Sequence, residues 1–242
     1  MASFYSRFYW RIGFGSRLYD LLTPESYVES MRRLVECLPA GKNTIFLDAG
    51  CGSGGLINIL KHRIQNGVYV GTDMLLEGLL SAQKKTDAGN ISNNVYFAQA
   101  DFTHSIPLKN NSVDIIIAHF SIYTVPQEKR GNIYREFRRL LREGGTLAVV
   151  EPLPEYSARR IVKDSIRRVS AKNEDIAAWI KKLFVYPLTY QFGLKFIERQ
   201  LRNGVWLTSK SEVLCAELRE NGFSVKHSEV VYADSATLVI AG

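Results

Sequence analysis

The sequence predicts an α/β protein whose mostly parallel sheet closes with an antiparallel hairpin at the C-terminus. Apolar runs of strand length alternate with helix-period segments between residues 44 and 151. This alternation is typical of a parallel sheet with right-handed crossovers. A glycine-rich turn follows the first strand, and the chain of 242 residues is long enough for one domain with its own core.

The segment before the first strand, residues 1–43, is expected to be a helical cover. A helix should start at Thr23, with Pro24 at its first position, where a missing N–H costs little, and end near Leu38. Residues 1–27 hold eight of the 27 aromatic residues in the chain. Such a cluster either packs on itself or walls a ligand site.

The first strand is expected over 44–48, and the sequence Leu-Asp-Ala-Gly-Cys-Gly-Ser-Gly runs from Leu47 to Gly54. A helix should follow, because apolar residues then recur at helical spacing: Leu56, Ile59, Leu60 and Ile64. Glycine tolerates positive φ and lets a ligand approach the backbone. The helix N-terminus behind it offers N–H groups and partial positive charge. This turn therefore predicts a nucleotide-type cofactor site.

Two glycine patterns overlap in this turn. Gly50, Gly52 and Gly55 match the dinucleotide pattern G-x-G-x-x-G. The same stretch matches D-x-G-x-G-x-G, beginning at Asp48. A carboxylate at that position would repel a pyrophosphate, but it suits the ammonium group of a methionine moiety. Asp48 therefore favours the second pattern.

The second and third strands each end near an acidic residue. Asp73 follows a strand over 68–72 and can accept hydrogen bonds from ribose hydroxyls, or cap a helix over 75–85. Asp101 and Phe102 follow a strand over 95–100, where they face a ligand or lie in a polar loop beside the core. A fourth strand over 113–119 ends at His119, and a fifth is expected over 145–151.

Taken in order, these motifs resemble class I S-adenosylmethionine (SAM) methyltransferases. Residues 110–114, Asn-Asn-Ser-Val-Asp, are similar to the family's turn before the fourth strand. Residues 141–145 are similar to its Leu-Lys-Pro-Gly-Gly turn, with Arg142-Glu143 in place of Lys-Pro. The resemblance implies a Rossmann-like seven-stranded sheet, SAM as cofactor and S-adenosylhomocysteine as product. It is strongest to the ubiquinone and menaquinone C-methyltransferase branch, where a Tyr-Asp pair like Tyr19-Asp20 lies near the cofactor.

The resemblance also assigns residues to the cofactor. Asp73 would bind the ribose, Asp101 the adenine amino group, and Met74 and Phe102 the faces of the adenine ring. The full set of expected cofactor contacts is Tyr19, Asp48, Ala49, Gly50, Gly52, Asp73, Met74, Asp101, Phe102 and His119.

Methyl transfer needs an aligned nucleophile and the exclusion of water. His119 is the leading candidate for a general base, because histidine titrates near neutrality. Tyr123 is a second candidate catalytic residue, and Glu151 is a weaker one. The alternatives are that His119 contacts the cofactor only through its backbone, or that the enzyme uses no dedicated base.

Residues 152–206 do not belong to the minimal fold and are expected to form a helical substrate cover. Between residues 156 and 205, eleven Lys and Arg face four Asp and Glu, which equals the whole excess of +7 in the chain. Apolar positions 161, 162, 166 and 169 share one helical side, and aromatic residues crowd residues 179–196. A solvated basic face, a membrane surface with a lipophilic substrate, and an acidic partner all remain open, whereas nucleic acid is disfavoured.

Residues 207–242 are expected to complete the sheet. Ser209 and Glu212 form a capping box that should open a helix ending at Asn221-Gly222. Two strands, over 223–230 and 237–241, should follow, with a turn near residue 233. We therefore divide a single domain into a helical cover (1–43), a cofactor core (44–151), a substrate cover (152–206) and a closing unit (207–242).

Composition sets the cellular context. A hydrophobic content of 46% and a charged content of 23% are ordinary for a soluble domain. Three unpaired cysteines and four scattered histidines favour a reducing compartment and no metal site. No signal peptide or membrane span is visible. We expect a cytoplasmic protein, and the sequence leaves open both peripheral membrane contact through the basic segment and the oligomeric state.

The sequence predicts a SAM-dependent methyltransferase that acts on a small, apolar or aromatic acceptor. One alternative within the fold is a phospholipid N-methyltransferase at the membrane surface. From other classes, an NAD(P)-linked oxidoreductase and a non-catalytic SAM-binding protein remain.

Overall fold

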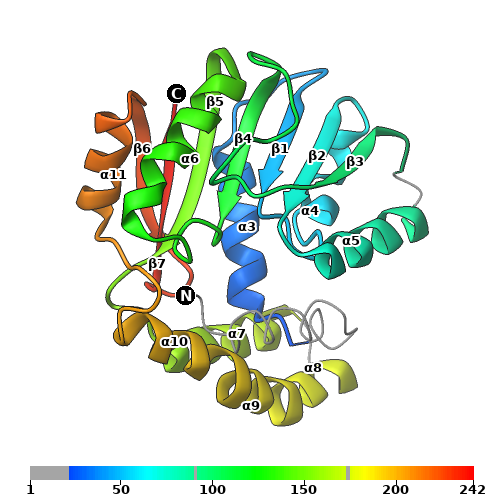
Figure 1. The fold of residues 1–242 in the computed structure, drawn as a ribbon. Coiled ribbons are helices and arrows are strands. Elements are labelled where there is room, and N and C mark those ends of the chain that lie inside the picture. The colour runs from blue at the N-terminus through cyan, green and yellow to red at the C-terminus, as the bar shows by residue number, and fades with distance from the viewer. Residues whose placement is uncertain (1–21, 90–91, 173–174) are drawn as a thin grey trace.

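The computed structural model describes residues 22–89, 92–172 and 175–242. The aromatic residues before position 22, including the expected cofactor contact Tyr19, lie outside the described residues. Where helices and strands are described, they follow the alternating order that the sequence predicts (Figure 1).

Seven strands form one sheet in the order β3-β2-β1-β4-β5-β7-β6. Their bounds are β1 Ile45–Ala49, β2 Val68–Asp73, β3 Val95–Gln99, β4 Val113–His119, β5 Leu141–Pro152, β6 Val225–Val231 and β7 Ala236–Ala241. The strands β1 to β5 pair in parallel, and β7 runs antiparallel between β5 and β6. The predicted fold class is confirmed, including the closing antiparallel hairpin.

Helices connect the strands and cover the sheet. Their bounds are α3 Glu25–Cys37, α4 Ile57–Ile64, α5 Leu76–Ala88, α6 Gln127–Leu140, α7 Ala158–Lys172, α8 Ile176–Ile180, α9 Tyr186–Leu188, α10 Lys195–Arg202 and α11 Ser211–Glu220. A 3-10 turn, η1, covers Ser92–Asn94. Two π-helical turns, η2 (Lys181–Val185) and η3 (Thr189–Leu194), join α8, α9 and α10 into one helical run.

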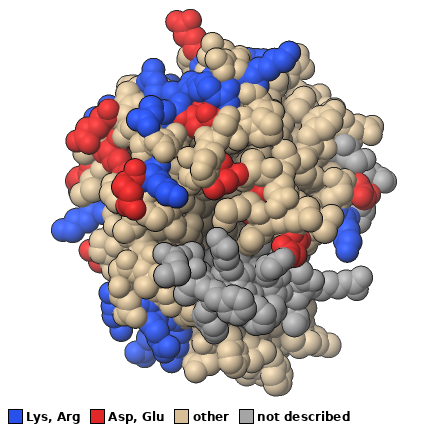
Figure 2. Space-filling model, in the orientation of Figure 1, with Lys and Arg blue, Asp and Glu red and all other residues tan. Residues whose placement is uncertain are grey.

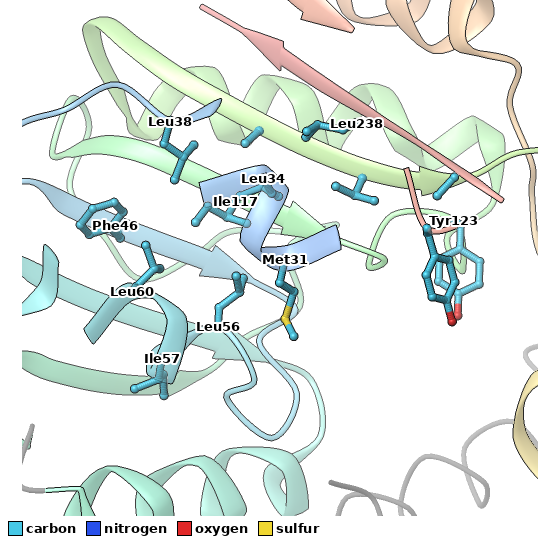
Figure 3. Packing of buried hydrophobic residues seen from close by; sticks show 14 of the residues in the cluster. Met31, Leu34, Leu38, Phe46, Leu56, Ile57, Leu60, Ile117, Tyr123 and Leu238 are labelled. Carbon is cyan, nitrogen blue, oxygen red and sulfur yellow. The ribbon is translucent and has the colours of Figure 1, made fainter. Parts of the chain in front are cut away.

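Neighbouring residues of the central strands supply two separate cores, because successive side chains of a strand point to opposite faces. Phe46 packs with Leu34 of α3 and Leu60 of α4. Leu47 packs with the α6 and α11 side chains on the other face. Figure 3 shows Met31 and Leu34 of α3 over the strands that carry Phe46 and Ile117.

The segment from α7 to α10 lies at the carboxyl ends of the parallel strands. Figure 1 shows it as a separate layer below the sheet, reached by one end of α3. Ser26 of α3 donates to the Asp164 carboxylate of α7 at 2.8 Å. The chain leaving this layer returns to the sheet, where the Leu207 N–H donates to the Tyr123 carbonyl at 2.9 Å. The position of this layer agrees with a cover over the edge that should hold ligands.

Several local predictions differ from the structure. Pro24 is the N-cap of α3 in an extended conformation, and the helix begins one residue later, at Glu25, rather than at Thr23. β5 begins at Leu141 rather than residue 145, because the Gly-Gly turn continues the strand through a shift in its register with β4. The capping box at Ser209 is wrong. The helix α11 begins at Ser211 with Lys210 at its N-cap and has no side-chain cap. Ser209 lies before the cap position, where its N–H donates to the Pro152 carbonyl of β5 at 3.2 Å. The division into four segments stays a prediction.

Candidate functional site

The glycine turn leaves β1 in a conformation that side chains disfavour. Gly50, Gly52 and Gly54 have φ values of 87°, 51° and 75°. A Cβ at Gly50 would lie only 2.5 Å from the Cβ of Ser121, in the loop that follows β4. Residue 50 must therefore be glycine both for its backbone angle and for the space around it.

Hydrogen bonds with β2 and α5 hold this turn in place. The N–H groups of Gly50 and Cys51 both donate to the Thr72 carbonyl, at 2.7 and 2.9 Å. The Lys85 ammonium of α5 donates to the Ser53 carbonyl at 2.8 Å. A turn held on both sides has already lost its conformational freedom before a ligand binds, which is the arrangement that favours tight binding.

Asp73, at the end of β2, joins the turn to α5. Its two carboxylate oxygens accept from the Gly52 N–H at 2.9 Å and the Leu75 N–H at 2.8 Å. Burial raises the pKa of Asp73, although these N–H groups pull it back. The helix α5 has Leu75 at its N-cap and no side-chain cap, so the capping alternative is wrong, and Asp73 instead lies before the helix and directly beside the glycine turn. Its expected contact with a ribose stays a prediction.

Asp48 is the buried acid of the site. Its carboxylate accepts a hydrogen bond from the Tyr69 hydroxyl at 2.5 Å, on the neighbouring strand β2. Burial raises the pKa of Asp48 to about 7; the Tyr69 hydrogen bond opposes this and the charge of Asp73 adds to it. A buried carboxyl group held this close to neutrality is poised to ionise when a cation approaches.

Asp101 and Phe102 follow β3 at the same edge. Burial alone would raise the pKa of Asp101, but hydrogen bonds from the Thr103 hydroxyl and backbone and from His104 outweigh it and lower that pKa. Phe102 lies beside the turn, since its ring is 3.6 Å from the place that a Cβ on Gly50 would take. Asp101 is therefore an ionised acceptor next to an aromatic face.

His119, at the end of β4, is enclosed by α3. Its Nε2 lies 2.9 Å from the Ser30 hydroxyl, and the rings of Tyr27 and Phe120 meet it edge-on at 4.8 and 4.9 Å. Burial lowers the pKa of His119 to about 3. The imidazole is therefore neutral at physiological pH and a weak base in this conformation.

Tyr123 lies in the loop that follows β4, and Glu151 lies near the end of β5. Tyr123 is buried, with its ring 5.4 Å from that of Trp206. Glu151 accepts the Ile122 N–H at 3.0 Å, and burial raises its pKa despite Arg130, whose guanidinium lies 3.9 Å away. Glu151 therefore holds the loop after β4, and nothing in these contacts points its carboxylate at a reacting atom.

That loop is itself strained. Phe120 has a φ of 52°, in the left-handed region that bulky residues rarely adopt. Glu151, which holds this loop, is connected to α11, because Arg130 of α6 also pairs with Glu217 of α11 at 3.2 Å. Arg130 and Glu151 are both almost fully buried. A buried polar network of Glu151, Arg130 and Glu217 thus fixes the loop that carries Ser121 against the glycine turn.

The parallel register brings most of the expected residues to one edge. Asp48 pairs with Gly71 and Ala49 with Thr72, so the ends of β1 and β2 are level. The residues that meet there are Asp48, Ala49, Gly50, Gly52, Asp73, Met74, Asp101, Phe102 and His119. The edge lies between β1 and β4, where the strand order changes direction, and such switch points bind ligands in open α/β sheets. Tyr123 lies further along the loop, under the cover segment.

Sequence reasoning missed the α3 contribution to this edge. Tyr27 and Ser30 lie one helical turn apart, and both contact His119. Their spacing of three residues on an amphipathic helix was the available signal. Nothing in the sequence, however, says which strand that helix crosses.

One group of possible metal ligands occurs within the described parts of the chain. Cys37, His227 and Glu229 have ligand atoms within 4.8 Å of one another. The Arg33 guanidinium donates to the same Glu229 oxygen at 2.7 Å, so a cation already faces the group. The group lies on α3 and β6, away from the glycine turn. The expectation of a site without metal stays a prediction. In the same described residues, none of the helices has the length and apolar content that crossing a membrane requires.

Comparison with known proteins agrees with this geometry. A family model described as a methyltransferase domain matches residues 40–193. The demethylmenaquinone methyltransferase of Thermotoga maritima is 27% identical over 128 residues, 53% of this chain and 52% of that protein. The malonyl-[acyl-carrier protein] O-methyltransferase of a Marinomonas species is 24% identical over 115 residues, 48% of this chain and 40% of that protein. The chain thus spans about half the length of these curated relatives or less.

Two solved structures share the fold. A SAM-dependent methyltransferase from Aquifex aeolicus superposes with a TM-score of 0.64 at 16% identity, covering 94% of this chain and 97% of that one. The geranyl diphosphate C-methyltransferase of Streptomyces coelicolor superposes with a TM-score of 0.61 at 12% identity, covering 88% of this chain and 79% of that one. Its structure holds Mg²⁺, geranyl diphosphate and S-adenosylhomocysteine.

Proposed function

This chain belongs to the methyltransferase-domain family, and from that premise we propose that it transfers the methyl group of SAM to a small apolar or aromatic acceptor. The observation that carries the proposal is the glycine turn at the switch point, held by β2 and α5 and faced by three acids. When bound, SAM would supply a methyl group on a positively charged sulfur, which is already a good electrophile.

The chain's own residues fit this cofactor. A Cβ at Gly50 would collide with Ser121, so glycine there lets the loop after β4 pack directly against the turn. Asp48, with its pKa near 7, would ionise beside the ammonium of the methionine moiety. Asp73 would accept from the ribose hydroxyls, Asp101 from the adenine amino group, and Met74 and Phe102 would contact the ring. Tyr19, which lies before the described residues, is proposed to close the site.

The aromatic wall beside His119 favours an apolar or aromatic acceptor. Tyr27 stacks on Phe120 at 5.6 Å, and Phe120 meets Tyr232 at 5.1 Å. Tyr232 in turn lies 6.1 Å from Tyr156 of the cover segment. Rings arranged in this way bind flat, poorly hydrated molecules and keep water out. We propose that the acceptor lies against this wall, in line with the methyl group.

His119 and Tyr123 remain the proposed catalytic residues, with a restriction on His119. With its pKa near 3 it can take up a proton only if α3 moves and the ring meets water. An acceptor that arrives as a phenolate, an enolate or a neutral amine needs no base. His119 would then position the acceptor and contact the cofactor through its backbone.

A phospholipid N-methyltransferase is the second candidate, because the cover segment exposes apolar side chains beside basic ones. An NAD(P)-linked oxidoreductase finds no support in the fold or in the relatives. A non-catalytic SAM-binding protein would differ only in lacking turnover.

The experiment that tests the proposal is calorimetric titration of the purified protein with SAM, S-adenosylhomocysteine and NADH. Binding of the two sulfur compounds, followed by release of S-adenosylhomocysteine with a phenolic or quinone-like acceptor, is the expected result. Binding of NADH alone would overturn the cofactor assignment. Binding of SAM without turnover on apolar, phospholipid or amine acceptors would indicate a non-catalytic SAM-binding protein.

A further inference from the structure

The helical run from α8 to α10 presents an apolar face to the outside. Between residues 176 and 192, the exposed positions carry nine apolar side chains and one polar one, Gln191. The apolar positions are Ile176, Ala177, Trp179, Ile180, Leu183, Phe184, Pro187, Leu188 and Phe192. We call these residues the outer apolar face. A surface helix ordinarily turns its charged side outward, whereas this run is apolar on its outer side as well.

The outer apolar side chains are exposed although the helical run itself is well packed. Ile176 is 79% exposed, Phe192 67% and Phe184 65%. The inner side of the same run is well packed, with buried side chains at Ala178, Val185, Tyr186, Thr189 and Leu194. Half of the large apolar side chains that the described residues expose lie in these seventeen positions. Apolar residues that are exposed singly need no explanation, but a contiguous face of this kind marks an interaction site.

Basic residues border this face. No Asp or Glu occurs between residues 176 and 197, whereas Lys181, Lys182 and Lys195 do. The Lys182 ammonium lies 5.3 Å over the Trp179 ring, and that of Lys195 lies 4.8 Å over the Tyr190 ring. Figure 2 shows tan and blue atoms at the bottom of the view, where Figure 1 places α9 and α10. Basic side chains therefore lie directly beside the apolar side chains of this face.

We propose that the outer apolar face binds the surface of an anionic membrane. Apolar side chains on a helix lying in the membrane plane enter the boundary between headgroups and acyl chains. Flanking lysines then meet the lipid phosphates, and an indole beside a lysine suits the same boundary. The face thus offers an apolar strip between basic borders, which is complementary to anionic lipid.

A second copy of this chain fits the same face less well. Symmetric pairing would place identical patches against each other. The same lysines of both copies, Lys181 and Lys182, would then border one interface, where like charges repel. The membrane assignment rests on the outer apolar face and not on the methyl-transfer proposal. Vesicle binding and SAM binding without lipid therefore test the two proposals separately. The membrane assignment also places a bilayer next to the cover segment, from which a lipophilic acceptor would enter.

The test is co-sedimentation of the full chain with vesicles of phosphatidylcholine alone or mixed with phosphatidylglycerol. The chain is expected to pellet with the anionic vesicles and to be released by salt. A double variant, Phe184→Ser with Phe192→Ser, should reduce the bound fraction about tenfold or more. The variant Lys181→Gln with Lys182→Gln should weaken binding and reduce its salt dependence.

Matched controls separate the face from general effects. Val213→Ser with Val230→Ser removes two exposed apolar side chains of α11 and β6 and should leave vesicle binding unchanged. Lys61→Gln with Lys129→Gln removes two exposed lysine charges outside the face and should also leave vesicle binding unchanged. Circular dichroism would check that each variant is folded, and SAM titration without lipid would check that the cofactor site is intact.

Three outcomes would overturn the proposal. The chain could fail to pellet with either kind of vesicle at low salt. The control variants could lose binding as much as the face variants do. Light scattering could show a dimer that Phe184→Ser with Phe192→Ser dissociates, which would assign the face to a second copy of the chain.

Discussion

Replacing Asp48 by Asn should stabilise the protein, and more so at high pH. The carboxyl group is buried, and its pKa rises from 3.8 to about 7 in the folded chain. A shift of about three units corresponds to about 4 kcal/mol at pH values above both pKa values. Asn keeps an oxygen that can accept from the Tyr69 hydroxyl but cannot ionise.

The sign follows from proton binding. Between the two pKa values the folded chain holds a proton on Asp48 that the unfolded chain has released. The stability contributed by this group therefore falls as pH rises from about 4 to about 7. At about pH 5 the loss is about 2 kcal/mol, and at about pH 8 it reaches about 4 kcal/mol. The advantage of Asp48→Asn should thus grow by about 2–3 kcal/mol between these two conditions.

Urea unfolding of the ligand-free protein, followed by circular dichroism at both pH values, measures this difference. Other titrating groups such as Glu151 are common to both proteins and cancel, provided that the two sites are independent. Asp87→Asn, at an exposed position of α5, is the matched control and should show no such change. The reasoning fails if Asp48→Asn has the same effect at both pH values, or if its advantage shrinks as pH rises.

The remaining predictions concern the cofactor and the site. Asp73→Ala should weaken SAM binding by roughly 1–3 kcal/mol, because ribose hydroxyls would lose a charged acceptor; unchanged calorimetric affinity, with Asp87→Ala as control, would remove the ribose assignment. Gly50→Ala should cost about 2–4 kcal/mol of stability, since a positive φ and a Cβ close to Ser121 add up. Gly204→Ala also has a positive φ but nothing within 4 Å of the new Cβ, so thermal unfolding should show a smaller loss there. Because burial lowers the pKa of His119 to about 3, kcat/KM should show no inflection from this group between about pH 5 and 8. An inflection near 6.5 that His119→Gln removes would show that the ring is exposed in the active state and acts as a base.

The sheet could be predicted from the sequence because each strand carries its own signal. β4 was bounded correctly, since an apolar run between a polar turn and a histidine leaves little choice. The acids of the site were found because each stands at the end of such a run, and parallel strands bring their carboxyl ends to one edge.

Contacts between distant segments could not be predicted in the same way. The enclosure of His119 depends on how α3 crosses β4, and no local pattern encodes that crossing. The missing cap of α11 has the same origin, because Ser209 is bound through its N–H to the Pro152 carbonyl of β5 and Lys210 precedes the helix in its place. The role of Arg130 was also hidden, since an arginine on a basic amphipathic helix gives no sign that it is buried.

A buried polar network behind the β4 loop connects the candidate site to the helix α11. Glu151 holds the Ile122 amide, Arg130 lies beside Glu151, and Glu217 of α11 completes the series. Opening of α11 would leave Arg130 without its nearer carboxylate partner, so the loop at the glycine turn should loosen with it. The free energy of opening α11, a C-terminal helix, then sets the upper limit on how strongly the loop amides are protected from exchange. The order of the reaction site is therefore set partly by the local stability of a distant element.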